Sequence, residues 1–300
     1  MTDTTEINKE YPKNFATYPQ NVKDIIEKDI LKREEGDPVR IAYDIAIKMH
    51  DGYTRKGIEK LDYITHSLQV YDLVKRCIAN NSISVSKKDR EIILAASILH
   101  DSVEDYKKKE RESGEISPIL AALEAEDILH DGFYFNVNLD YWDDWNRGKN
   151  IKNVINLVFE LTNKLEFLDD KGNKISKIEW QVDHIAKASD AAKLIKICDK
   201  TMSSVSNIEE VPKWNYKKLT TNIKESREVV DAAQIDVKNP AITYAAKIFN
   251  MVASASENIL DSMKKDKMKI PPKHPIASFS LKIIEEMIRT GNDKPLQASR

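Results

Sequence analysis

The chain has 300 residues, with 47 Lys and Arg against 49 Asp and Glu, a formal net charge of −2, and 41% hydrophobic residues. A chain of this length can bury a core without disulfide or metal staples, so any metal site is expected to serve chemistry rather than folding. The balanced charge argues against a protein that wraps nucleic acid or binds duplex DNA, and against an acidic disordered protein. A small anionic ligand remains compatible with it, because a local group of Lys and Arg can bind one.

Residues that break helices are scarce, with 8 Gly and 10 Pro, about half of their usual share. Residues 173–290 contain no glycine, which favours long helices. The 2 cysteines are too few for a disulfide framework, and the first residues have no apolar signal core. No segment approaches the run of about 18 apolar residues that spans a bilayer. We therefore expect an all-α, cytoplasmic protein that is not bound to a membrane.

The composition divides the chain into three parts. Residues 1–36 are polar and are expected to form a mobile or loosely docked N-terminal arm, with one helix around 22–32. Residues 37–265 carry the apolar periodicity of a helical bundle and form the main domain. Residues 266–300 are expected to form a last helix and a tail.

In chain order, Asp37 and Pro38 predict the cap and the first turn of a helix. A second helix is predicted over 66–79. Ser86 with Asp89 three residues later predicts the cap of a third helix. This third helix is apolar nearly all round, so it should lie in the middle of the bundle, and polar groups at its far end should be buried or line a cavity.

The second half of the chain continues the helical pattern. Ser176 and Glu179 match a capping box and open a long helix on which Asp199 falls on an apolar stripe. A carboxylate in such a place must be paired, hydrogen-bonded or coordinating, since burial of a bare charge is costly. The other predicted helices cover residues 118–129, 151–163, 213–235, 240–252 and 279–290.

Two imidazoles and two carboxylates on three of these helices suit a divalent cation: His66, His100, Asp101 and Asp199. The alternative for His66 is an ordinary hydrogen-bonded core histidine.

Two further carboxylates follow this set. Glu104 and Asp105 lie one turn beyond His100, along the same face of the helix. Carboxylates in that place can orient water or move a proton. The alternative for them is a solvated helix end.

Five short motifs, in order over residues 38–205, resemble the hydrolase domain of the RelA/SpoT alarmone enzymes, which belong to the HD phosphohydrolase superfamily. They are HDGYTRKG at 50–57, YITH at 63–66, LHDSVED at 99–105, ELTNK at 160–164 and IKICDK at 195–200.

The resemblance implies an all-α HD domain that holds one metal ion, usually manganese. It implies removal of pyrophosphate from the 3′ position of guanosine tetra- or pentaphosphate, (p)ppGpp, the alarmone of the stringent response. His66, His100, Asp101 and Asp199 would be the metal ligands, and Glu104 and Asp105 would activate the attacking water or relay its proton. The residues that would contact the nucleotide are Arg55, Lys56, Thr162, Ser203 and Asn207.

The chain departs from the family pattern at several positions. The loop between Arg55 and His66 is two residues longer than usual, and Asp62 stands where the family has Pro. Ser203 occupies the place of an Asn that binds substrate, and Asn207 could compensate one turn later. For Arg55 and Lys56, a solvated loop pair remains the alternative.

An aromatic insertion at Tyr141, Trp142 and Trp145 has no counterpart in the family. It is interpreted either as a lid or as packed surface aromatics.

These departures keep two other functions open. The first is an HD hydrolase for another substrate, such as an adenosine alarmone, a nucleoside monophosphate or an RNA 3′ end. The second is a nucleotide-binding, antitoxin-like module without turnover. The sequence leaves the metal's identity and the oligomeric state undetermined.

Overall fold

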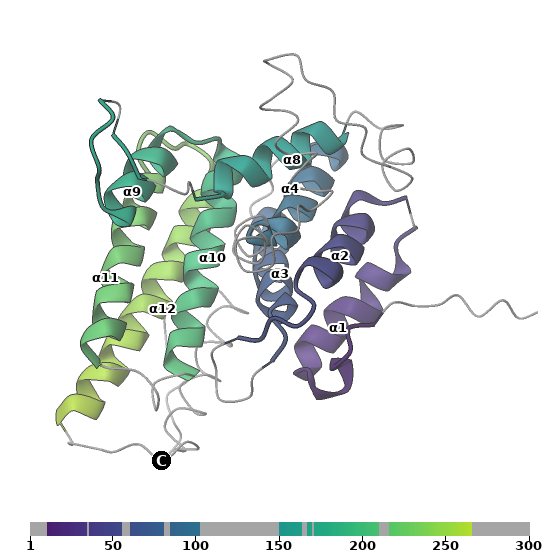
Figure 1. The fold of residues 1–300 in the computed structure, drawn as a ribbon, viewed down its shortest axis with the longest axis horizontal. Helices are drawn as coiled ribbons and strands as arrows, with labels where there is room; N and C mark the ends of the chain where they lie inside the picture. Colours follow the sequence, from purple (N-terminus) through teal and green to yellow (C-terminus); the bar gives the residue numbers. More distant parts are fainter. Residues whose placement is uncertain are drawn as a thin grey trace, which may run out of the picture.

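The structure of the chain is a computed structural model (Figure 1), which describes residues 11–34, 36–55, 61–80, 85–102, 150–163, 167–169, 171–209 and 216–265. In these ranges the chain forms helices and two isolated antiparallel bridges, Thr54 with Asp62 and Leu168 with Lys174. The predicted all-α class is confirmed for this part of the chain. The helices predicted at 118–129 and 279–290, and the aromatic insertion, lie outside the described residues.

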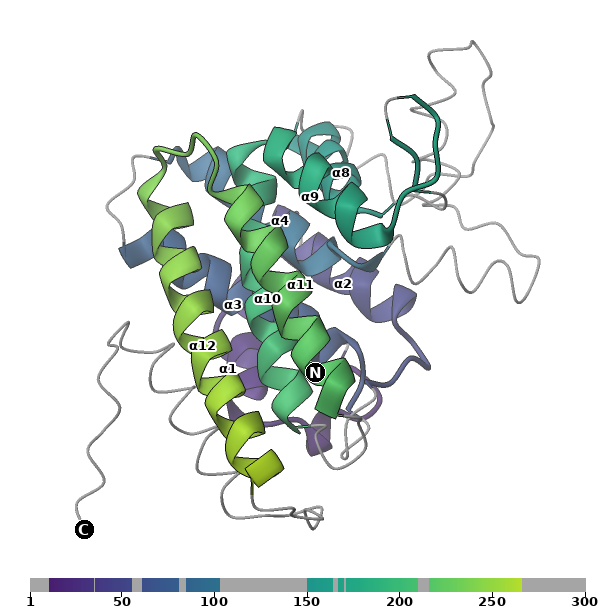
Figure 2. The same ribbon diagram turned by 90° about the vertical axis from the view of Figure 1, so that its left-hand side faces the viewer.

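Three helices form the centre of the bundle, and each contacts the other two: α3 (Ile64–Asn80), α4 (Lys87–Leu99) and α10 (Asp190–Glu209). Around them lie α1 (Gln20–Lys28), α2 (Pro38–Met49), α8 (Asn150–Leu161), α9 (Lys177–Lys187), α11 (Tyr216–Ala233) and α12 (Pro240–Lys265), with short 3-10 turns at Phe15–Thr17 and Ile30–Lys32. Helices α2 and α8 pack on α4, while α10, α11 and α12 run side by side (Figure 2). The apolar α4 is therefore enclosed by neighbours, as its sequence predicted.

Side chains cap the predicted helix starts. The Asp37 carboxylate accepts the Val39 N–H at 2.8 Å, with Pro38 in the first turn of α2. The Ser86 hydroxyl accepts the Asp89 N–H at 3.1 Å at the start of α4. Each cap satisfies a backbone donor that the helix itself leaves without a partner.

Replacing Ser86 by Ala should therefore reduce the free energy of unfolding by about 1 kcal/mol. Urea unfolding followed by circular dichroism measures this loss. Ser86→Asn retains a capping oxygen and should change the free energy of unfolding much less. An equal loss in both variants would show that the hydroxyl does not act as a cap.

The prediction of one long helix from Ser176 onward is wrong. The capping box of Ser176 and Glu179 is present, but α9 ends at Lys187. Ala188 is extended, and the Ser189 hydroxyl accepts the Ala192 N–H at 3.3 Å at the start of α10. A serine in this position favours a new helix start over continuation. Asp199 consequently lies on a helix of 20 residues, which is shorter than α12 with its 26.

The N-terminal segment is docked, so the expectation of a mobile or loosely docked arm is wrong for residues 11–34. Its apolar side chains Tyr18, Val22, Ile26 and Ile30 are buried and belong to the hydrophobic core. Polar contacts add to this packing, since Asp29 accepts hydrogen bonds of 2.6 Å from both the Tyr71 hydroxyl and the Lys75 ammonium of α3.

These contacts make stability depend on pH. Burial alone would raise the pKa of Asp29, but the hydrogen bonds from Lys75 and Tyr71 outweigh it and lower the pKa below its usual value. The stabilisation is therefore complete above the unfolded pKa of about 3.9 and is lost as the pH falls through the lower folded value. Asp29→Asn should be less stable than wild type at neutral pH and should lose less stability on acidification. Urea unfolding at a series of pH values tests this, and parallel losses in the two proteins would contradict it.

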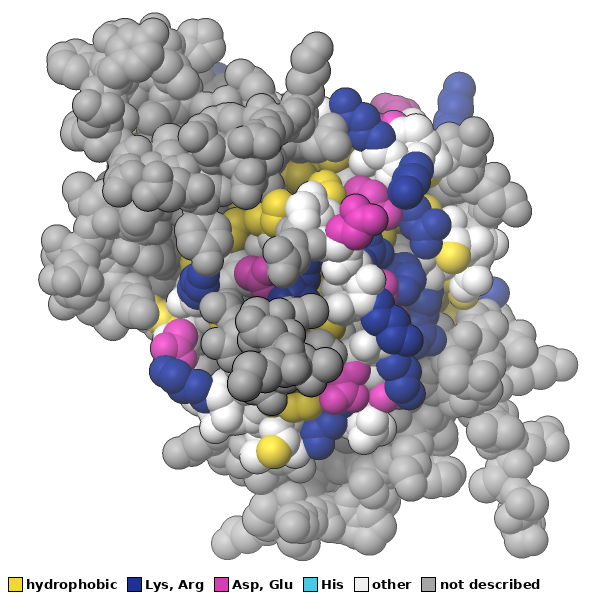
Figure 3. Space-filling view, turned by 90° about the vertical axis from the view of Figure 1, so that its right-hand side faces the viewer, with side chains coloured by type: hydrophobic (Ala, Val, Ile, Leu, Met, Phe, Trp, Pro, Cys, Tyr) yellow, Lys and Arg dark blue, Asp and Glu magenta, His cyan; other side chains and the backbone are white. Residues whose placement is uncertain are grey.

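On the face that carries α1 and α2, acidic and basic side chains lie close together, and hydrophobic side chains show only in small areas (Figure 3). In the ranges that the structure describes, no helix has both the length and the apolar character to cross a membrane.

Candidate metal centre

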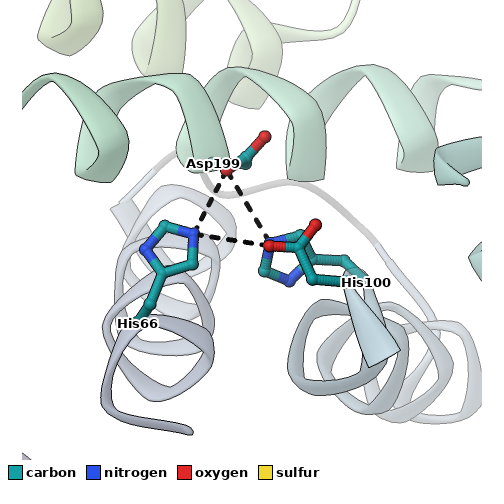
Figure 4. Close-up of side chains that lie close together, drawn as sticks. His66, His100 and Asp199 are labelled. Atoms are coloured by element: carbon teal, nitrogen blue, oxygen red, sulfur yellow. Dashed lines mark hydrogen bonds and ion pairs between the residues drawn. The ribbon is translucent and has the colours of Figure 1, made fainter. Parts of the chain in front are cut away.

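The four side chains predicted as metal ligands lie together in the structure, and Figure 4 labels three of them, His66, His100 and Asp199. His66 comes from the first turn of α3, His100 and Asp101 directly follow α4, and Asp199 lies in the middle of α10. One nitrogen or oxygen of each residue lies within 4.8 Å of the corresponding atom of the other three. Residues up to 133 positions apart in the chain thus meet at one point, where the three central helices pack together.

The cluster is closely spaced and buried. His66 Nε2 is 3.2 Å from Asp199 Oδ1, and His100 Nε2 is 3.2 Å from Asp101 Oδ2. The cross distances are 3.7 Å from His100 Nε2 to Asp199 Oδ1 and 3.9 Å from His66 Nε2 to Asp101 Oδ2. His100 is only 1% exposed and Asp199 only 7%. The buried Asp199 and the partly buried Asp101 require positive charge close by.

The orientation of His100 suits a cation ligand. Its Nδ1 lies 2.9 Å from the Ser97 carbonyl oxygen, which can only accept, so Nδ1 carries the hydrogen. In the neutral ring the lone pair is therefore on Nε2, which is buried and makes no hydrogen bond within the described residues. Nε2 also lies 3.2 Å from Asp101 Oδ2 and 3.7 Å from Asp199 Oδ1, so a cation between the ring and these carboxylates would meet the lone pair. A hydrogen bond to the far ring nitrogen is also the usual way in which proteins orient a metal-binding histidine.

The electrostatics also favour positive charge at the centre. Burial alone would lower the pKa of His100, but Asp101 and Asp199 raise it to about 10. Burial would raise the pKa of Asp199, yet Lys196 and the two histidines hold it well below its usual range. Burial would also raise the pKa of Asp101, but His100 and His66 lower it. Both carboxylates are thus ionised, and a set of two imidazoles and two carboxylates fits first-row divalent cations such as manganese, iron or zinc.

Two side chains that the sequence reasoning did not single out support the ligands. The Tyr63 hydroxyl donates a 2.7 Å hydrogen bond to Asp101 Oδ2, and its ring lies between those of His50 and His66. Lys196 Nζ lies 3.5 Å from Asp199 Oδ2, the oxygen that faces away from the histidine contact. Both belong to the YITH and IKICDK motifs, which was the only signal for them in the sequence.

Removing the Tyr63 hydroxyl should weaken metal binding. Tyr63→Phe is expected to lower the affinity for Mn²⁺ by about 10-fold, because partners that orient a ligand typically contribute 10- to 100-fold. Isothermal titration calorimetry measures this change. The matched control is Tyr216→Phe, which removes a 2.7 Å hydrogen bond to Asp261 between α11 and α12. Equal affinities in the two variants would exclude a supporting role for Tyr63.

No protein-family model matches the chain, and no curated protein matches it either. Among solved structures, the chain is similar to one described as "A metazoan ortholog of SpoT hydrolyzes ppGpp and plays a role in starvation responses". The similarity covers 69% of this chain and 93% of that chain, with 21% identity and a TM-score of 0.45. That protein is of the kind that the five motifs resemble.

The residues predicted to contact substrate have different surroundings. The Arg55 guanidinium donates to Gln69 Oε1 at 3.2 Å and to the Ser206 hydroxyl, so it joins its loop to α3 and α10 and is not a solvated side chain. Burial is the largest cause that lowers the pKa of His66, and the positive charge of Arg55 lowers it further. The Ser203 hydroxyl donates to Asp199 Oδ1 at 3.2 Å.

The structure describes fewer contacts of the remaining residues that are predicted to act in the site. The Thr162 hydroxyl, just beyond the end of α8, donates to the Val158 carbonyl of that helix at 2.8 Å. Asn207 lies on α10, and its side chain is outside the described part of the chain. Lys56, Glu104 and Asp105 lie outside it as well. Their roles, like those of the four ligands, remain predictions.

Proposed function

We propose that the chain is a metal-dependent phosphohydrolase that removes pyrophosphate from the 3′ position of (p)ppGpp. The observation that carries this proposal is the cluster of His66, His100, Asp101 and Asp199, in which His100 Nε2 lies 3.2 Å from Asp101 Oδ2 and 3.7 Å from Asp199 Oδ1. Manganese is the proposed ion, and the cytoplasm the proposed location.

The charge around the cluster supports a phosphorylated substrate. Asp101 and Asp199 carry two negative charges, and Lys196 Nζ lies 3.5 Å from Asp199 Oδ2. A divalent cation would balance the two carboxylates. The charges of Lys196 and Arg55 would then favour an anion, such as a pyrophosphate group.

Each group has a defined task in the proposed reaction. When bound, a divalent cation would polarise the phosphoryl group and acidify water. Arg55 would hold the nucleotide through a fixed guanidinium, since it is already oriented by Gln69 and Ser206. Glu104 and Asp105, three and four residues after Asp101 in the sequence, would take the proton from the attacking water.

A second candidate is the same hydrolysis on another nucleotide, such as an adenosine alarmone, a nucleoside monophosphate or an RNA 3′ end. One observation favours it. Ser203, at the position of the substrate-binding Asn of the resembled family, directs its hydroxyl at Asp199. The substrate contact expected there has been replaced by a contact to a proposed ligand.

One experiment separates these functions. Protein stripped of metal with a chelator is given Mn²⁺ and a panel of ppGpp, an adenosine alarmone, nucleoside monophosphates and an RNA with a 3′ phosphate. We expect pyrophosphate release from ppGpp only after Mn²⁺ is returned. Turnover of another panel member instead would establish the second candidate. Binding without turnover in calorimetry would establish a nucleotide-binding module.

A further inference from the structure

Asp62, the residue at which the Arg55 loop departs from the family motif, is held by the N-terminal segment. Its Oδ2 accepts a 2.6 Å hydrogen bond from the Tyr18 hydroxyl, and its Oδ1 accepts one of 2.8 Å from Asn14 Nδ2. Both carboxylate oxygens are thus bonded to a segment more than 40 positions away in the chain.

Among the polar contacts that join the N-terminal segment to the region around the Arg55 loop, the hydrogen bond from Tyr18 to Asp62 is the strongest. Tyr18 is only 3% exposed, and burial and the Asp62 carboxylate raise its pKa, so the hydroxyl remains a donor. The segment also pairs Lys13 with Asp51 at 2.7 Å, but these side chains are 78% and 49% exposed. Solvent screens such a surface pair, whereas a partly buried hydrogen bond to a carboxylate keeps its strength.

The position of Asp62 sets the position of Arg55. Asp62 lies opposite Thr54 in an antiparallel bridge. The Arg55 N–H donates to the Leu61 carbonyl at 2.7 Å, and the Tyr63 N–H donates to the Tyr53 carbonyl at 2.9 Å. These backbone bonds join the segment that carries Arg55 to the segment around Asp62, which Tyr18 and Asn14 hold.

The same residue fixes the other side of the site. The Asp62 carbonyl accepts hydrogen bonds from the Thr65 N–H at 3.1 Å and the Thr65 hydroxyl at 2.8 Å, at the start of α3. His66 follows directly, and Tyr63, the partner of Asp101, precedes that turn. Asp62 therefore lies between the proposed nucleotide contact and the proposed metal ligands.

We propose that residues 11–18 act as a strut that positions Arg55 for substrate, with Tyr18 and Asp62 as its positioning residues. The effect on substrate rests on the proposed function. The effect on the loop does not, because it follows from the hydrogen bonds alone.

The test compares two tyrosines that each donate a 2.6 Å hydrogen bond to an aspartate. Tyr18→Phe removes the bond to Asp62, and the control Tyr71→Phe removes the bond to Asp29, which also anchors the N-terminal segment but does not touch the loop. Both rings remain to fill the core. Hydrogen exchange measured by NMR should show the Arg55 and Tyr63 amides exchanging about 10-fold faster in Tyr18→Phe and unchanged in Tyr71→Phe.

Kinetics form the second arm. With ppGpp and Mn²⁺, Tyr18→Phe should raise KM by about 10-fold and leave kcat nearly unchanged, because a loosened Arg55 weakens the binding of substrate and transition state alike. Tyr71→Phe should change neither constant. Asp62→Ala should reproduce the effect of Tyr18→Phe, and the double variant should be no worse than Asp62→Ala.

Three results would overturn the proposal. The first is unchanged hydrogen exchange of the Arg55 and Tyr63 amides in Tyr18→Phe. The second is an equal change of these exchange rates in Tyr18→Phe and Tyr71→Phe, and the third is faster exchange in Tyr18→Phe with an unchanged KM. If the wild-type protein does not hydrolyse ppGpp, the proposed function fails, and the exchange arm still decides whether the strut holds the loop.

Discussion

Asp101→Asn is expected to lower the affinity for Mn²⁺ by about 100-fold and to remove the hydrolysis that Mn²⁺ supports. The substitution keeps the size of the side chain but removes a partly buried charge that faces His100 at 3.2 Å and accepts from Tyr63. Removing one partner of a buried charged contact costs about 3 kcal/mol, which corresponds to about 100-fold in affinity.

Thermal unfolding measures this loss without reference to any substrate. At a Mn²⁺ concentration of 100 times the wild-type Kd, the ion should stabilise the wild-type protein by about 2.7 kcal/mol, or about 4 °C in Tm for a chain of this length. At the same concentration, Asp101→Asn should gain about 0.4 kcal/mol.

The matched control for the metal experiment is Asp183→Asn. Asp183 is an exposed aspartate on α9 that pairs with Lys187, and its replacement should leave the full Mn²⁺ shift. A wild-type Tm that does not respond to Mn²⁺, or an Asp101→Asn variant that responds like the wild type, would contradict the assignment of the cluster.

Arg33→Ala is expected to reduce the free energy of unfolding by about 3 kcal/mol. The Arg33 guanidinium lies among three carboxylates, at 2.5 Å from Glu91, 3.2 Å from Asp37 and 3.3 Å from Asp29, and its side chain is only 16% exposed. Truncation leaves these carboxylates partly buried without their shared partner, and their repulsion opposes the docking of the N-terminal segment.

Urea unfolding of Arg33→Ala and Arg76→Ala measures how much the buried position matters. Arg76 pairs with Asp72 one turn away on α3, and the two side chains are 40% and 30% exposed. Such a surface pair contributes at most about 1 kcal/mol. Equal losses in the two variants would show that the Arg33 contacts are no stronger than an ordinary surface pair.

The sequence predicted the helix starts best because caps are local. The capping hydrogen bonds of Asp37, Ser86 and Ser176 reach two or three residues along the chain, and the local residue types indicate them. The break between α9 and α10 was missed because the apolar stripe from Ile185 to Ile195 continues through it. Periodicity reports which face is buried and does not require the helix to be continuous.

Contacts between segments that are distant in the chain could not be predicted from the sequence. Tyr18, Val22, Ile26 and Ile30 recur every four residues, which indicates a buried stripe, but the polar residues between them suggested an arm. The pairing of Tyr63 with Asp101 links positions 38 apart, and nothing in the local composition of either segment indicates it. The residue types of the metal cluster were predictable, whereas the side chains that hold them depend on the packing of α3, α4 and α10.

The origin of the cluster in three helices has a consequence for folding kinetics. His66 and Asp199 are 133 residues apart, and joining such distant segments costs chain entropy that only extensive native packing repays. The complete ligand set should therefore assemble late, after the main folding barrier. Interactions that form after the barrier slow unfolding and leave the folding rate almost unchanged. A bound cation should therefore lower the unfolding rate and so prolong the lifetime of the folded chain.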